Sequence, residues 1–302
     1  MASLYTHQSE NVRKTFILMG GFLIFLIALG WIFSQALASP AILYFAIVLA
    51  IVMNLISYWH SDKIALALSG AKVVTREEQR ELYRTIENLC ITAGLPLPRI
   101  YVIDAPQINA FATGRDKEHS AIAVTSGALQ KLSQTELEGV LAHELSHIGN
   151  RDILVATVVV VLAGIIALMS DFFMRSLWFG GGSRGRNREG GGIFLVIGLL
   201  SAIIAPITAT LIKLAISRQR EFLADASGTL LTRYPEGLAS ALEKIEADMS
   251  TLPKARSGTA HLYISNPFKG TKVLNKLFMT HPPLTERILR LRGGLASSVD
   301  ER

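Results

Sequence analysis

The stretch Glu136–Ser170 reads ELEGVLAHELSHIGNRDILVATVVVVLAGIIALMS and contains two distinct patterns. Its first half holds His-Glu-x-x-His, from His143 to His147, a spacing typical of zinc-binding helices. Its second half, from Ile153 to Ser170, has 18 residues without a charge, which suits the interior of a bilayer. We therefore expect one helix to carry the metal-binding pattern and to continue into a membrane segment.

The composition also indicates a membrane protein. Of the 302 residues, 50% are hydrophobic and only 18% are charged, whereas soluble domains carry about 25% charged residues. The net charge of +6 is spread among carboxylates, with no basic stripe interleaved with aromatic residues, so we expect a lipid bilayer as partner and no nucleic acid. The single cysteine, Cys90, excludes an intramolecular disulfide and lies in a helical pattern that predicts a core position.

Four hydrophobic segments define the organisation of the chain. They cover about residues 15–37, 41–58, 153–173 and 191–213, and a span needs about 20 apolar residues. The uncharged part of the third segment is short, so a buried core helix is an alternative interpretation of it. For the first segment the alternative is a cleaved signal peptide, but its long apolar run and the apolar segment that follows favour an uncleaved hairpin.

These segments divide the chain into five parts, and the soluble parts contain both helices and strands. We expect a tail (1–14), a transmembrane hairpin (15–58), a soluble region (59–152), a second hairpin with a Gly- and Arg-rich loop (153–213), and a second soluble region (214–302). Helices are predicted at 75–95 and 132–149, each with a capping box at its start, and after the fourth segment at 217–232, 235–250 and 282–292. Strands are predicted at 99–104, 109–113 and 120–126. The predicted fold class is a mainly α membrane protein with an α+β domain that holds a small β-sheet.

The chemistry of the metal pattern follows from its spacing. His143 and His147 lie one turn apart on one helix face, and Glu144 beside them can reach a metal-bound water. Zinc in such sites acidifies a water and polarises a carbonyl, and the glutamate moves the proton to the leaving amine. A hydrolytic zinc needs a third protein ligand, for which Glu221 is the candidate. Asp225, four residues later, could accept the other N–H of a ligand histidine, although a solvated helix face would also explain this acidic pair.

Membrane topology supports this set of ligands. His147 precedes the third segment by about six residues, roughly 9 Å of helix, and Glu221 follows the fourth by about eight, roughly 12 Å. Two crossings between them return the chain to the same side of the membrane, so the ligands can meet.

The chain resembles the HtpX family of membrane-bound zinc metallopeptidases, relatives of the CAAX prenyl endopeptidases. The stretches that carry the resemblance are NAFATG (109–114), AIAVTSGAL (121–129), ELEGVLAHELSHIGNRD (136–152), REFLAD (220–225) and THPPLTERI (280–288). The resemblance implies a zincin-like catalytic domain with one Zn²⁺ per chain. Its ligands would be His143, His147 and Glu221, with Glu144 as the catalytic base and Asp225 as support for a ligand histidine.

The resemblance also implies where a substrate binds. The strand from Ala121 to Val124 (Ala121, Ile122, Ala123, Val124) matches the edge strand that pairs with an extended substrate, with Asn109 beside it. His281 and Arg287 match a histidine and an arginine that lie near the substrate and could stabilise the oxyanion. A helix start is the alternative reading of His281, because two prolines follow it.

The implied activity is proteolytic quality control of membrane proteins, at the cytoplasmic side of the inner membrane. A processing protease for specific substrates, such as prenylated proteins, and a zinc-dependent scaffold without turnover are the alternatives. Arg13, Lys14 and Lys63 favour a cytoplasmic catalytic side, whereas four arginines between the third and fourth segments (175, 184, 186 and 188) would lie outside. A second hairpin that does not fully cross is therefore an open alternative. The sequence has no signal for an oligomeric state.

Overall fold

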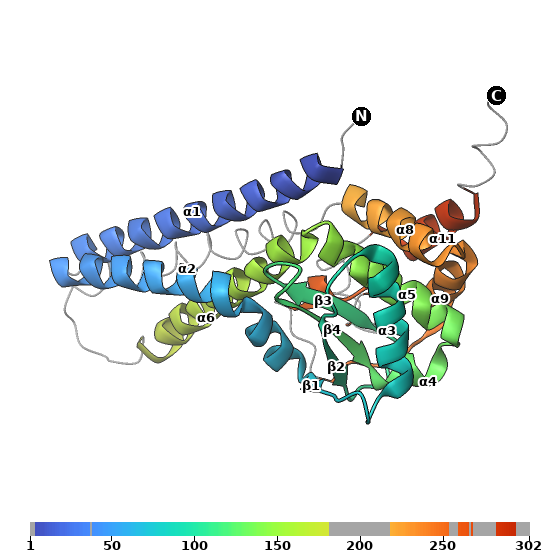
Figure 1. Ribbon diagram of the computed structural model, residues 1–302. Helices are drawn as coiled ribbons and strands as arrows, with labels where there is room; N and C mark the ends of the chain where they lie inside the picture. Colours follow the sequence, from blue (N-terminus) through green and yellow to red (C-terminus); the bar gives the residue numbers. More distant parts are fainter. Residues whose placement is uncertain are drawn as a thin grey trace.

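Three long helices extend together from a part of the molecule that holds a small sheet (Figure 1). The computed structural model describes residues 4–36, 38–180, 218–253, 259–265, 267 and 282–293. Helices α1 (Leu4–Ala36) and α2 (Pro40–Ser69) form an antiparallel hairpin. Pro40 lies at the start of α2, where a helix does not need its missing N–H. The third long helix, α6 (Asp152–Gly180), packs against both.

The first two predicted membrane segments are confirmed as long apolar helices. Within the described residues, Asn11–Gln35 and Pro40–Ser69 are each long and apolar enough to cross a bilayer. A third span results only if α5 (Gln134–Gly149) and the start of α6 are counted as one bent unit. The fourth predicted segment, 191–213, lies outside the described residues.

The prediction that the metal-binding helix continues into the third membrane segment is wrong. Helices α5 and α6 meet at an angle of 85°. Arg151, at the break, has a φ of +59°, a left-handed conformation that no helix interior adopts. An apolar run predicts burial but not direction, because a helix that is hydrophobic all round suits both a bilayer and a protein interior. From Ile153 to Ile166 most side chains of α6 are buried within the protein.

Within the described part of the chain, the sheet has four strands in the order β1-β2-β4-β3 and mixed direction. Its strands are β1 (Lys72–Val73), β2 (Arg99–Ile103), β3 (Ala110–Gly114) and β4 (Ser120–Thr125). Strand β2 is antiparallel to β1 and parallel to β4, and β3 and β4 form an antiparallel pair. The three predicted strands are confirmed, and the two-residue β1 was not predicted because it is too short to show a pattern.

Alternate residues of the strands face two different cores. Ile122 and Val124 face the first core, with α3 (Arg80–Ala93), α5 and α9 (Pro235–Ala247). Ala121 and Ala123 face the second core, which contains Phe111, Tyr263, Val160 of α6 and the end of α2. A third core joins α1, α2 and α6 through their apolar side chains. Helix α6 is therefore packed between the sheet and the α1–α2 hairpin. Cys90 is buried in the first core, as predicted.

The other helices also agree with their sequence signals. The short α4 (Ser126–Lys131) follows β4, and α8 (Arg218–Thr232) and α11 (Leu284–Gly293) complete the helical side with α9. The capping box of Ser133 and Glu136 opens α5 as predicted. Thr75 and Glu78 also hydrogen-bond each other, but in a turn that precedes the start of α3 at Arg80.

Glu136 also joins α5 to α9. Burial by itself would raise the pKa of its carboxyl group, but hydrogen bonds from Lys244, Ser240 and the backbone of Ser133 lower it to about 2. Glu136 is thus ionised at neutral pH, and its carboxylate binds Lys244 at 2.7 Å and Ser240 at 2.5 Å. This contact fixes the start of the helix that carries the metal-binding pattern.

Candidate metal centre

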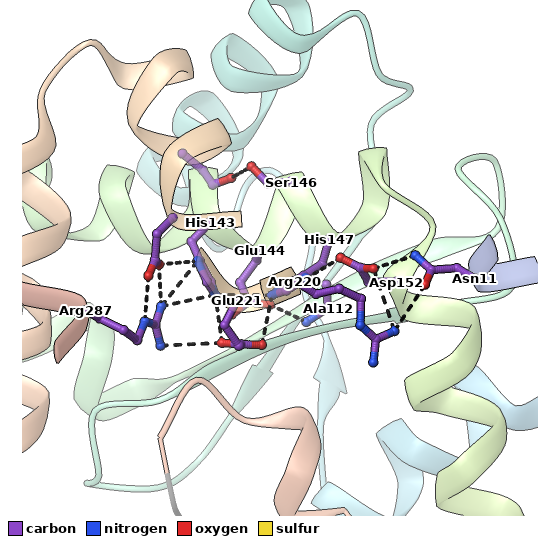
Figure 2. A network of polar contacts seen from close by, with 12 residues as sticks. Asn11, Ala112, His143, Glu144, Ser146, His147, Asp152, Arg220, Glu221 and Arg287 are labelled. Atoms are coloured by element: carbon purple, nitrogen blue, oxygen red, sulfur yellow. Dashed lines mark hydrogen bonds and ion pairs between the residues drawn. The ribbon is translucent and has the colours of Figure 1, made fainter. Parts of the chain in front are cut away.

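Two histidines from α5 and a carboxylate from α8 meet in the interior of the protein (Figure 2). His143, His147 and Glu221 place their candidate ligand atoms within 4.8 Å of one another. The Nε2 atoms of the two histidines are 3.2 Å apart, and the Glu221 carboxylate is 3.8 Å from one and 3.6 Å from the other. The structure thus brings together the three predicted ligands, although about 70 residues separate Glu221 from His147.

The donor atoms fit a tetrahedral zinc ion. Ligands bound at 2.0–2.1 Å in tetrahedral geometry are roughly 3.4 Å apart, close to the separations in this cluster. Two imidazoles and one carboxylate are also a donor set of catalytic zinc sites, which keep the fourth position open. Charge supports a cation as well, because four carboxylates (Glu144, Asp152, Glu221 and Asp225) face two guanidinium groups (Arg220 and Arg287).

The first histidine is held by a buried ion pair. His143 Nδ1 lies 2.9 Å from Asp225, which leaves Nε2 directed at the cluster. Asp225 also accepts two hydrogen bonds from Arg287, at 2.6 and 2.9 Å. Burial by itself would raise the pKa of Asp225, but the charge of Arg287 and the contact with His143 lower it to about 2. The predicted support of a ligand histidine by Asp225 is thus present in the geometry.

The second histidine has its own carboxylate, which the sequence analysis missed. His147 Nδ1 lies 3.0 Å from Asp152 at the start of α6, so its Nε2 also points to the cluster. Burial would lower the pKa of His147, but the hydrogen bond to Asp152 and the charges of Glu221 and Asp152 raise it to about 9. Both ligand histidines therefore have the carboxylate partner that commonly orients metal-binding imidazoles.

The side chain of Glu144 contacts the sheet, not Asp225 or Asp152, which hold the two histidines. Its carboxylate accepts a hydrogen bond of 2.8 Å from the backbone N–H of Ala112 in β3. Ala110, Ala112 and Gly114 alternate with the residues whose backbone groups hydrogen-bond β4, so their own N–H and C=O groups face the outer side of β3. The candidate base therefore lies at the edge of the sheet.

The predicted edge strand is wrong. The strand from Ala121 to Val124 lies in β4, which pairs with β2 on one side and with β3 on the other. Among the strands that the structure describes, the one at the edge beside the site is β3, Ala110–Gly114. Both segments are short, apolar and buried, so alternation alone does not tell an inner strand from an edge strand. Strand order depends on pairing between distant segments.

Two further predicted substrate residues have structural contacts. Asn109 is buried and its side chain bonds Gln107 and Ser265, so that it ties residue 265 to the start of β3. Arg287 is 0% exposed and lies behind His143, where it pairs with Asp225 and Glu221. In this position Arg287 supports the carboxylates around the candidate metal ligands, and its role beside a substrate stays a prediction. His281 lies outside the described residues.

Glycine 228 sets the distance between the two ligand helices. A Cβ atom at Gly228 of α8 would lie 2.9 Å from the backbone nitrogen of His143 and 3.1 Å from its Cα. Gly228, Asp225 and Glu221 share one face of α8, because they are separated by three and four residues. The absence of a side chain at Gly228 thus lets this face approach α5 closely enough for Glu221 to reach both histidines.

Sequence signals existed for some of the missed residues. Asp152 ends the stretch GNRD and is the first acidic residue after His147. The prediction of one continuous helix did not include the break that brings Asp152 beside His147. Arg220 and Asn11 contact Asp152 from α8 and α1. No local pattern relates Asn11 to a site about 140 residues later.

Comparison with known proteins agrees with this geometry. A family model described as Peptidase family M48 matches residues 76–294, which include the whole cluster. A protein named "Protease HtpX homolog" from Thermoanaerobacter pseudethanolicus is 48% identical over 297 residues, covering 96% of this chain and 97% of the relative. One of the same name from Tropheryma whipplei is 43% identical over 290 residues, with 96% and 98% covered. Another from Pyrococcus furiosus is 49% identical over 249 residues, with 82% and 84% covered.

A solved structure is similar in fold. The crystal structure of S. mikatae Ste24p aligns with a TM-score of 0.51 and 20% sequence identity. The alignment covers 95% of this chain and 67% of that protein. At this identity the similarity concerns the arrangement of helices and strands.

Proposed function

The chain belongs to peptidase family M48 and is a membrane metalloprotease, and from this premise we propose that it is a zinc-dependent endopeptidase that cleaves misfolded or damaged membrane proteins. The observation that supports this most directly is the position of Glu144 between the His143–His147–Glu221 cluster and the edge strand β3. A metal, a base and a peptide-binding edge are the three parts that peptide hydrolysis requires.

The residues of the cluster divide the chemistry between them. Zinc, when bound by His143, His147 and Glu221, supplies the Lewis acidity that polarises a carbonyl and acidifies a water. Glu144 accepts the proton of that water and later donates it to the leaving amine. Asp225 and Asp152 hold the two imidazoles with Nε2 toward the cluster. Arg287 neutralises the buried Asp225 carboxylate behind His143.

We propose that the substrate pairs with β3 as an added strand. The accessible part of this edge is short, because the Ala110 carbonyl accepts a bond from Ile264 and the Gly114 N–H faces Thr157. Between them, Ala112 presents its backbone beside Glu144. Pairing through backbone atoms is tolerant of side-chain sequence. Such tolerance suits an enzyme that removes unfolded segments of many proteins.

The membrane helices suggest where these segments come from. The α1–α2 hairpin packs on α6, and α6 packs on the sheet that ends in β3. We propose that the catalytic part faces the cytoplasmic side of the inner membrane, where loops of bilayer proteins are within its reach. A zinc-dependent scaffold would not need a carboxylate at the position of Glu144.

Removal of the candidate base tests the mechanism. We expect Glu144→Gln to keep about one zinc per chain and to lower the cleavage rate by a factor of about 10²–10⁴, because only proton transfer is lost. Detergent-purified wild type and variant are incubated with an unfolded membrane protein, and the masses of the products are measured. Glu138→Gln, on the same helix but outside the cluster, is the matched control and should cleave like the wild type.

A second variant tests the third ligand. Glu221→Ala should lose most of its zinc, as measured by metal analysis of the purified protein. Full zinc occupancy in this variant would reject Glu221 as a ligand. Undiminished cleavage by Glu144→Gln would reject the mechanism.

A further inference from the structure

An asparagine of the first membrane helix reaches the metal centre. Asn11 lies at the start of the apolar part of α1, and it is 3% exposed. Its side chain contacts the break between α5 and α6, which begins three residues after His147. Figure 2 shows Asn11 next to Asp152 and Arg220, on the side of His147 that faces away from His143.

All the hydrogen-bonding groups of the Asn11 amide are used. Its Nδ2 donates to the carbonyl of Asn150 at 3.2 Å and to Asp152 Oδ1 at 2.7 Å. Its Oδ1 accepts from Arg220 Nη1 at 3.4 Å. A carboxamide has two donor hydrogens and one carbonyl acceptor, so it alone among side chains of this size matches two acceptors and one donor. A leucine at position 11 would remove the hydrogen bonds that the amide makes with these partners, and an aspartate there would repel the Asp152 carboxylate.

The two acceptors belong to the part of the backbone that must turn sharply. The carbonyl of Asn150 is at the end of α5, where helix carbonyls have no partner within the helix. Asp152 starts α6 after the turn of 85°. Its other oxygen, Oδ2, holds His147 Nδ1 at 3.0 Å. One amide thus binds both sides of the break and the carboxylate that orients a candidate metal ligand.

We propose that Asn11 is a positioning residue through which the first membrane helix holds Asp152, and therefore His147, in the geometry that binds the metal. The inference rests on the metal centre proposed above. It links membrane embedding to metal affinity, because α1 must lie beside the break between α5 and α6 for the amide to reach Asp152. A chain whose first helix is displaced would bind zinc more weakly, although every ligand is still present.

Zinc affinity of the full-length protein in detergent tests this role. We expect Asn11→Leu to weaken zinc binding by about 10-fold, the lower end of the effect of losing a partner of a metal ligand. Affinity is measured by competition with a chelator of known strength. Asn54→Leu is the matched control, because Asn54 is a buried asparagine of α2 whose Nδ2 bonds only its own helix, at Ala50, among the described contacts. It should bind zinc as the wild type does.

A double-mutant cycle separates positioning from general damage. If Asn11 acts through Asp152, the loss caused by Asn11→Leu should largely disappear when Asp152→Asn is already present. An equal loss in both backgrounds would overturn the proposal. So would equal zinc affinity in Asn11→Leu and Asn54→Leu.

Hydrogen exchange of the metal-free protein gives a readout that does not depend on zinc. Backbone amides of residues 149–153 should exchange faster in Asn11→Leu than in Asn54→Leu, because the break loses its clamp. Equal exchange in the two variants would overturn the inference. Absence of zinc binding by the wild type would reject the metal centre but not the role of Asn11 at the break. Failure of the metal centre and failure of the Asn11 proposal therefore give different results.

Discussion

The candidate metal ligands of this protein are held by charge pairs at the level of single residues. His143 is supported by Asp225 and Arg287, and His147 by Asp152, Asn11 and Arg220. The side chains of Asp225 and Asp152 are almost completely buried, and that of Arg287 is completely buried. A buried charge is tolerated only when it is paired, and loss of one partner leaves the other without compensation. These pairs should therefore matter more than the many ion pairs at the surface.

Asp225→Asn should show this difference. We expect it to destabilise the protein by about 3 kcal/mol, since Arg287 would remain buried without its strongest partner. Zinc affinity should fall about 10- to 100-fold, because His143 loses its carboxylate. Thermal unfolding of the metal-free protein in detergent measures the first effect, and chelator competition measures the second.

An exposed pair on α11 is the control for this prediction. Glu286 and Arg290 are 3.0 Å apart, with side chains 39% and 59% exposed. Glu286→Gln should change stability by less than about 1 kcal/mol, because water screens such pairs. Similar losses in Asp225→Asn and Glu286→Gln would contradict the importance that we assign to burial.

At the level of elements, α5 is the helix on which the site is assembled. It packs against α3, α9 and the sheet through its apolar side chains, and it approaches α8 and α9 most closely at glycines. Gly228 of α8 and Gly139 of α5 are two points of close approach, where a Cβ would lie within 3.0 Å of backbone atoms of the neighbouring helix. Because both neighbours are backbone atoms, a larger residue must move a whole helix.

Gly228→Ala should therefore disturb the site from a distance. The new Cβ would lie 2.9 Å from the His143 nitrogen, so α8 must shift and Glu221 must move away from the histidines. We expect a loss of stability of about 1–3 kcal/mol and zinc binding weakened by about 10-fold or more. Gly164→Ala on α6 is the control, because no atom lies within 4 Å of its added Cβ. Zinc affinity of Gly228→Ala equal to that of Gly164→Ala would show that α8 accepts the added methyl group without displacing Glu221.

At the level of the whole molecule, the length of α2 relates the catalytic part to the membrane. Twenty residues from Pro40, about 30 Å of helix and the thickness of the hydrocarbon core, end at Trp59. Trp59 is half exposed, and the guanidinium of Arg115 lies 4.6 Å from the centre of its ring. Tryptophan and arginine are typical of the membrane surface. The turn that joins β3 to β4, which contains Arg115, is therefore expected at the height of the lipid head groups.

Cysteine labelling tests this arrangement. We expect Ser39→Cys, between α1 and α2, to react with an impermeant maleimide in intact cells. Glu118→Cys, in the β3–β4 turn, should react only after the membrane is permeabilised. Wild type is the background control, because Cys90 is buried. Labelling of both variants from the same side would exclude a hairpin that crosses the bilayer.

Local signals were sufficient for most elements of the fold. Short strand-like runs predicted the three longer strands, the capping box predicted the start of α5, and long apolar runs predicted α1 and α2. Gly149 and Asn150 are also residues typical of a helix end. The continuous apolar run that follows them fits a helix in a new direction as well as a straight one.

The sequence by itself determined the candidate site, since His143, Glu144, His147, Glu221 and Asp225 are recognisable from spacing and family resemblance. Residue types and helical periodicity are local properties, so they can be read along the chain. Only the tertiary structure decided that β3 rather than β4 is the edge strand, that Arg287 is buried, and that Asp152 holds His147. These facts depend on contacts between distant segments. Asn11 and Asp152 are 141 residues apart along the chain and 2.7 Å apart between side-chain atoms.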